Sequence, residues 1–223
     1  MNRRSASDLI DHEHHAWEEI LGLLAGSSNA PVVLKASREA GEKTLYLLQI
    51  STKSYLGAVA LEAGGMLWDN GWVVLLGAGH PELYGSLAGW NGLEESPFPP
   101  LKGMLVVAYD AAGGFFALDT GTFGGHGLIH YWAPDSLEWE STDLQYSGFL
   151  NWLAEGDLEQ YYSTFRWQDW RKDMAQLASG EIFAYYPPLW TREGGEESSS
   201  KAPVSVQEAW RAVIESTESE DGA

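Results

Sequence analysis

A cluster of histidines and acids near the N-terminus is the first group of residues that could do chemistry. His12, His15 and Glu19 are spaced at i, i+3 and i+7, so they share one face if this segment is helical. Imidazole and carboxylate groups on one face are suitable ligands for a transition metal. The spacing differs from the His-Glu-x-x-His pattern of zinc peptidases. A solvated polar helix face is the alternative interpretation.

A second candidate is Asp119, which ends an apolar run and begins an Asp-Thr-Gly triplet. The triplet resembles the active-site turn of aspartic proteases, whose chemistry needs two carboxylates that share a proton. Only one such triplet occurs in the chain, so a second copy of the protein would have to supply the other carboxylate. The alternative is an ordinary strand that ends in a turn.

The glycine-rich segment 121–127 follows directly. Such loops bind phosphates through backbone N–H groups, but this one lacks the Gly-Lys-Ser/Thr ending of a P-loop. We consider a pocket under this loop, with Asp110, Asp119, His126 and His130 around it. Such a pocket would belong to a small-molecule-binding protein or a hydrolase. A tightly turned loop at the edge of a sheet is the alternative.

Tryptophan is in excess, with 11 residues in the chain. Most of them lie at core-facing positions of the predicted elements, where a large ring buries well if its N–H finds a partner. Carbohydrate binding through exposed tryptophans is the alternative, with Trp132 and Trp139 on neighbouring strands. Trp90 and the adjacent Asn91 complete the residues to which we assign a binding role. No residue is assigned a catalytic role, and no cofactor is predicted.

The charge of the chain narrows the choice of partners. Thirteen Lys and Arg against 32 Asp and Glu give 13 − 32 = −19 over 223 residues. This charge repels nucleic acids and anionic membrane surfaces and favours a basic protein as partner. The absence of Cys excludes disulfide scaffolds, thiolate metal sites and cysteine nucleophiles. Arg3 and Arg4 are not followed by an apolar stretch, so we expect a cytoplasmic protein.

The order of the predicted elements gives the fold class. A helix is expected from the capping signal at Ser5 to Gly26, and periodicity does not decide between helix and strand for 55–61. Short, glycine-punctuated strands follow, with Asp69-Asn70-Gly71 as the clearest hairpin turn. The expected strands are 66–69, 72–76, 104–109, 115–118, 128–132 and 137–140. Helices are expected within 146–155, 158–165 and 167–178.

This order predicts an α+β fold with a mainly antiparallel sheet and flanking helices. Residues 1–192 are expected to form one domain. Residues 193–202 read as an exposed linker because they are rich in Gly, Ser and Glu. Residues 203–223 are expected to form a C-terminal helix and acidic tail that dock on the same domain, beginning with a capping box at Ser205.

Several tryptophan-anchored segments, in this order, resemble a bacterial family known as domain of unknown function 2625. They are Asp69-Asn70-Gly71-Trp72, Leu76-Gly77-Ala78-Gly79-His80-Pro81, Trp90-Asn91, Gly113-Gly114-Phe115-Phe116-Ala117, Phe123-Gly124-Gly125, 131–140, Gly156-Asp157-Leu158 and Arg166-Trp167. The resemblance runs from the predicted hairpin to the aromatic and proline-rich segment 185–190. It implies no activity, catalytic residue or cofactor.

A more distant likeness is to the SUKH superfamily of bacterial toxin-immunity proteins and yeast cell-wall regulators. It rests on His80-Pro81-Glu82-Leu83-Tyr84, which leads to Trp90-Asn91-Gly92, and on Phe149-Leu150 further on. The likeness implies an α+β fold whose sheet binds other proteins. The missing catalytic constellation and the net charge favour a non-enzymatic protein-binding module, in its specific form an immunity-type inhibitor of a basic toxin.

Overall fold

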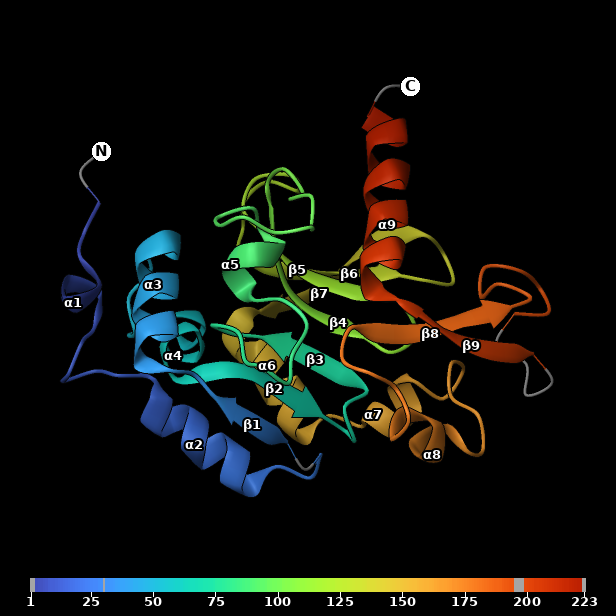
Figure 1. Ribbon diagram of the computed structural model, residues 1–223, viewed down its shortest axis with the longest axis horizontal. Helices are drawn as coiled ribbons and strands as arrows, with labels where there is room; N and C mark the ends of the chain where they lie inside the picture. The colour runs from blue at the N-terminus through green and yellow to red at the C-terminus, as the bar shows by residue number, and fades with distance from the viewer. Residues whose placement is uncertain (1–2, 30, 195–198, 222–223) are drawn as a thin grey trace.

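The centre of the molecule is an antiparallel sheet whose seven strands lie in their sequence order (Figure 1). The computed structural model describes residues 3–29, 31–194 and 199–221. Helices flank this sheet, so the predicted α+β class is confirmed. The strands are β1 (Val32–Lys35), β2 (Ala63–Trp68), β3 (Val73–Leu76), β4 (Met104–Asp110), β5 (Phe115–Asp119), β6 (Leu128–Ala133) and β7 (Glu138–Gln145).

The turn between β2 and β3 is the hairpin predicted at Asp69-Asn70-Gly71. All three residues have positive φ angles, of 47°, 58° and 83°. Asp, Asn and Gly are the residues that adopt this conformation most readily. The ladder that follows pairs Trp68 with Val73 and Gly65 with Leu76.

Successive side chains of the sheet bury against different layers. Phe115 packs on Trp90 and Trp210, whereas Phe116 packs on Tyr131 and Phe149. Helices α5 (Leu87–Trp90) and α9 (Val206–Asp221) therefore cover one face, and α6 (Tyr146–Glu155) covers the other (Figure 1). Because both faces are covered, β3 and most of β4 are buried.

The N-terminal segment differs from the single helix expected there. The Ser5 cap is present and starts α1 (Ala6–Leu9), but the next helix, α2, spans Trp17–Gly26. Between them the Asp11 carboxylate accepts hydrogen bonds from the backbone N–H groups of Glu13 and His14, at 3.0 and 2.7 Å. An aspartate that binds its own backbone in this way competes with helix formation.

The helices at 55–62 and beyond β7 follow the sequence expectations more closely, whereas those at 38–48 and 87–90 were not predicted. Residues 55–61, for which periodicity left two possibilities, lie in helix α4 (Tyr55–Glu62), which follows α3 (Arg38–Leu48). Beyond β7, α6 ends at Glu155, as expected. Shorter helices than expected follow, α7 (Leu158–Tyr161) and α8 (Trp170–Met174).

A second, smaller sheet lies near the C-terminus and was not predicted. It pairs β8 (Glu181–Tyr186) with β9 (Ser200–Ser205). Strand β9 thus includes the last three residues of the segment predicted as linker, and 195–198 lie outside the described residues. Helix α9 follows directly, and its Trp210 is fully buried and donates a hydrogen bond of 2.8 Å to the carbonyl oxygen of Pro99. Within the described part of the chain, no helix has the length and apolarity needed to cross a membrane.

Candidate functional site

The structure does not bring the four residues considered around the glycine-rich loop into one pocket. Asp119 pairs with Met104 at the start of β4, whereas Asp110 is the last residue of that strand. The two carboxylates therefore lie at opposite ends of the β4–β5 hairpin. His130 is near Asp119, because it pairs with Ala117 on β5. His126 is exposed on the loop.

Asp110 closes the β4–β5 hairpin from inside the protein. Its Oδ1 accepts hydrogen bonds from the backbone N–H groups of Ala112 and Gly114, both at 2.9 Å, and its Oδ2 accepts one from the Tyr131 hydroxyl at 2.7 Å. Burial raises the pKa of this carboxyl, and the hydrogen bonds oppose that rise. The side chain is fully buried and satisfied, so it has a structural role with no access to a substrate.

Asp119 organises the glycine-rich loop. Its carboxylate accepts hydrogen bonds from the backbone N–H groups of Gly121, Phe123 and Gly125, at 2.9, 3.0 and 2.7 Å. Burial raises its pKa, but these hydrogen bonds outweigh that effect and lower it to about 2. His130 stacks on Phe123 at 4.3 Å between ring centroids. An ionised, satisfied aspartate explains the loop without a shared-proton carboxylate pair.

The other predicted binding residues take part in packing. Trp90 is fully buried between Phe98, stacked at 3.8 Å, and the sheet. The Asn91 side chain links α5 to β4 by donating to the carbonyl oxygen of Val106 and accepting from its N–H, at 2.8 and 2.7 Å.

The tryptophans on β6 and β7 do not form an open platform. Trp132 is 3% exposed, and Trp139 is half-buried. Their rings meet edge to face at 5.7 Å between centroids. The most exposed tryptophan among the described residues is Trp190, at 57%, which lies elsewhere, just after β8.

The histidine cluster near the N-terminus is also dispersed, which corrects the prediction of a shared helix face. His12 lies in the non-helical segment between α1 and α2. The Nδ1 atom of His15 accepts a hydrogen bond from the Trp17 N–H at 3.2 Å, and its Nε2 lies 3.5 Å from Glu62. Within the described residues, no three His, Asp or Glu side chains gather as metal ligands would.

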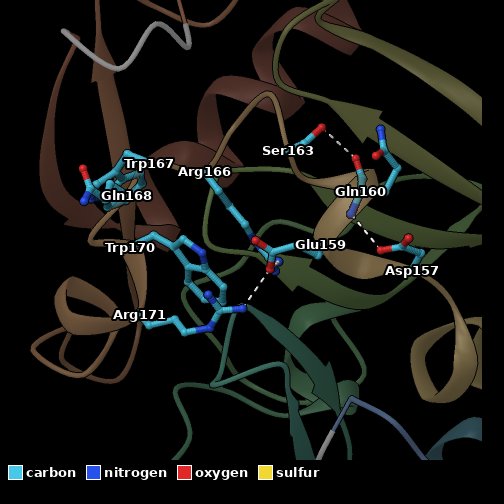
Figure 2. Close-up of a pocket in the computed structure, with 9 residues that line it drawn as sticks. All are labelled: Asp157, Glu159, Gln160, Ser163, Arg166, Trp167, Gln168, Trp170 and Arg171. Carbon is cyan, nitrogen blue, oxygen red and sulfur yellow. Dashed lines mark hydrogen bonds and ion pairs between the residues drawn. The ribbon is translucent and has the colours of Figure 1, made fainter.

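A hollow that the sequence interpretation missed lies where α7 and α8 meet the β2–β3 turn. We call it the arginine pocket; its volume is about 530 Å³ (Figure 2). It is lined by Asp157, Glu159, Gln160, Ser163, Arg166, Trp167, Gln168, Trp170 and Arg171. The Asp157 carboxylate caps α7 by accepting from the Gln160 N–H at 2.9 Å, and this cap fixes one wall.

Arg166 lies buried at the bottom of the arginine pocket. Its side chain is only 3% exposed, and its Nη2 lies 2.6 Å from Asp69 Oδ2 in the β2–β3 turn. The guanidinium carbon lies 4.0 Å from the ring centroid of Trp170, 4.6 Å from that of Trp72 and 5.1 Å from that of Tyr162. Ion pairing and cation–π contacts together offset the cost of burying this charge.

Glu159 joins Arg166 to a second arginine at the rim. Its Oε2 accepts hydrogen bonds from Arg166 Nη1 at 3.3 Å and from Arg171 Nη2 at 2.8 Å. Figure 2 shows its carboxylate at the end of the Arg166 side chain, with the bond to Arg171. The Arg171 guanidinium also lies 4.3 Å from the Trp170 ring centroid. Two guanidinium groups therefore converge on one carboxylate oxygen beside one indole ring.

The buried Tyr162 contacts Arg166 in this pocket and is close to Asp110. The Tyr162 ring contacts Arg166, and burial raises the pKa of its hydroxyl further above the usual range, with the nearby Asp110 carboxylate adding to the effect. Polar groups in a low-dielectric interior interact strongly. The predicted residue Asp110 thus lies outside the lining of the pocket.

Strand β7 provides a different surface, the outer edge of the sheet. Three carboxylates of β7 and one in the turn before it are exposed, and none of the four has an ion-pair partner among the described residues. We call this surface the acidic edge: Asp135, Glu138, Glu140 and Asp143. Within the described chain, no strand pairs with β7 on its outer side. Asp143 has a positive φ of 58°, near the irregular end of the ladder with β6.

The comparisons with known proteins agree with the order of segments noted in the sequence. A family described as protein of unknown function DUF2625 matches residues 6–209. The chain belongs to this family. It is 38% identical over 208 residues to the putative uncharacterized protein YbfG of Escherichia coli (strain K12), covering 93% of this chain and 94% of that protein.

Another member is an uncharacterized protein of Haemophilus influenzae (strain ATCC 51907 / DSM 11121 / KW20 / Rd). It is 32% identical over 214 residues, which cover 94% of this chain and 93% of the relative. No solved structure matches. The predicted membership of the DUF2625 family is confirmed, and the function of the family is unknown.

Proposed function

We propose that this protein is a non-enzymatic binding module for a basic protein, and that the acidic edge is its binding surface. The observation that carries the proposal is the outer side of β7, where no described strand pairs and where four exposed carboxylates have no ion-pair partner among the described residues. An exposed strand edge offers unpaired N–H and C=O groups to a further strand. A net charge of −19 adds long-range attraction for a basic partner.

The chemistry beside the acidic edge supports a cationic side chain as the point of contact. An aromatic hollow of about 310 Å³ lies between β7, α6 and α7. Trp152 and Tyr161 line it, and Glu140 lies at its rim. A Lys or Arg side chain of the partner would meet ring faces and a carboxylate there, which are its two preferred contacts.

The negative charges of the acidic edge disfavour a second copy of this chain as the protein that binds there. Like charges placed on neighbouring strands are destabilising, and β7 would set Glu138 and Glu140 against acids of the copy. The partner that fits is therefore of opposite charge. An immunity-type inhibitor of a basic toxin is the specific form of the proposal, in keeping with the SUKH likeness of the segment around Asn91.

The test uses purified basic toxin domains encoded next to genes of this family, titrated calorimetrically against the full chain at low and high salt. We expect binding that weakens as salt rises. The variant E138Q/E140Q should bind about tenfold more weakly, since each exposed ion pair contributes up to roughly 1 kcal/mol.

The matched control is E18Q/E19Q, which removes the same charge from helix α2. It should bind within about twofold of the unaltered protein, because only long-range attraction changes. Equal weakening by both double variants, binding that ignores salt, or no binding by any of these domains would each overturn the proposal.

A further inference from the structure

The arginine pocket already contains a carboxylate, and that carboxylate belongs to the protein. Glu159 places one oxygen within hydrogen-bond distance of both Arg166 and Arg171. Two guanidinium groups that converge on one oxygen form a geometry suited to binding an anion. The side chain of Glu159 is 63% exposed, so it reaches into this position from the solvent side.

Arg166 retains unused capacity for hydrogen bonds. A guanidinium has five N–H donors. The Nη1 group makes two long hydrogen bonds, both of 3.3 Å, to Glu159 and to the carbonyl oxygen of Leu158. The buried Nε has no hydrogen-bond partner among the described residues. A buried donor without an acceptor is costly, so the present contacts leave the Arg166 guanidinium only partly satisfied.

The bond between Glu159 and Arg171 is easily opened. Their side chains are 63% and 55% exposed, and ion pairs at such positions contribute little to stability. A second hollow, of about 460 Å³, shares Asp157, Glu159 and Arg171 with the arginine pocket. The ion pair therefore stands between two neighbouring hollows, and its opening would join them.

We propose that the arginine pocket binds a small molecule through a single carboxylate group, which replaces Glu159 between Arg166 and Arg171. Glu159 then acts as an internal occupant that holds the two arginines in place when the ligand is absent. Trp167 and Trp170 also line the pocket, and the rest of the ligand lies beside them.

The acidic side chains near the arginine pocket favour a ligand with one negative charge over a ligand with two. Asp157 lines both hollows, and Asp69 is held 2.6 Å from Arg166 Nη2. A phosphate or a dicarboxylate would bring a second charge close to these acids, and like charges disfavour each other. The ligand class is thus a monocarboxylate.

The test is a chemical-shift titration of the ¹⁵N-labelled full chain with sodium acetate, and separately with phosphate, at constant ionic strength and neutral pH. We expect acetate to shift backbone amides within 157–171. The E159Q variant removes the internal competitor and should bind acetate about fivefold more tightly, as the loss of two weak ion pairs implies. The R171Q variant should bind acetate at least about threefold more weakly.

The matched control is E18Q, which removes the same charge on helix α2 and should leave acetate affinity unchanged. Tightening in E159Q but not in E18Q supports the proposal. Four results would overturn it: no shifts in any variant, the same affinity in all of them, phosphate bound as tightly as acetate, or shifts located outside 157–171. Because this site is separate from the acidic edge, its failure would leave the proposed function unaffected.

Discussion

The ion pair between Asp69 and Arg166 gives the sharpest test of how this fold is held together. We consider the substitution Asp69→Asn, which removes the charge and keeps the size of the side chain. Asp69 has a φ of 47°, and Asn tolerates this conformation well. The substitution therefore leaves the hairpin turn intact and isolates the effect of the lost charge on Arg166.

The expected loss of stability in D69N follows from the burial of the ion pair. Removing one partner of a buried ion pair costs about 3–5 kcal/mol. The Asp69 side chain is 14% exposed, and Arg166 keeps its longer bond to Glu159, so we expect the lower end of that range or slightly less, about 2–3 kcal/mol. Loss of this size is a large share of the stability of a typical domain.

The assay is urea unfolding followed by circular dichroism, with the free energy of unfolding extrapolated to water. The control is Asp143→Asn, a substitution of the same chemistry at a residue with a similar φ of 58° and an exposed carboxylate. It should change the free energy of unfolding by about 0.5 kcal/mol or less. The double variant D69N/R166M completes a thermodynamic cycle.

We expect the effects of D69N and R166M on the free energy of unfolding to be non-additive, with a coupling energy of about 2 kcal/mol. If D69N costs no more than D143N, the buried ion pair does not stabilise the junction between the β2–β3 turn and α7. If the effects of D69N and R166M simply add, the two side chains act independently, and the description of Arg166 given above is wrong.

Three further predictions concern one histidine and two glycines. Burial lowers the pKa of His130, so the folded protein binds a proton on this imidazole less readily than the unfolded chain does. The free energy of unfolding should therefore fall as the pH drops below the pKa of His in the unfolded chain, about 6.5. The H130Q variant should lose less stability than the unaltered protein between pH 7.5 and 5.5, as measured by urea unfolding. A Cβ at Gly114 would overlap the Tyr131 hydroxyl, so G114A should lower the midpoint of thermal unfolding strongly. At Gly22, inside α2, a Cβ meets nothing within 4 Å. The G22A variant should therefore gain about 0.5–1 kcal/mol in the free energy of unfolding, as measured by thermal unfolding.

The features that the sequence predicted well are those encoded by neighbouring residues. The turn at Asp69-Asn70-Gly71 needs positive φ angles at adjacent positions, and the residue types alone indicate this. The strand that begins at Phe115 is likewise indicated locally, by a short apolar run that follows the turn residues Gly113 and Gly114. The strands β2 to β7 were placed to within a few residues, apart from the C-terminal end of β7, for the same reason.

Features that depend on distant residues were missed. The expected histidine face failed because Asp11 binds its own backbone and because its N–H donates to the Thr52 hydroxyl, 41 residues away. Arg166 was noted in the sequence only as part of a family-like pair with Trp167. Its partners Asp69 and Glu159 come from separate elements, and no spacing rule relates them.

The strict sequence order of the seven strands has a consequence for biosynthesis. Each strand from β2 onward pairs with the strand that precedes it in the sequence, so the sheet can grow strand by strand as the chain leaves the ribosome. Helix α9 is made after all seven strands of the sheet, yet its Trp210 covers Trp90 and Phe115. An apolar face of the nascent sheet therefore stays open until α9 has been made. Chains that stop before α9 would expose that face and become targets for chaperones and proteases.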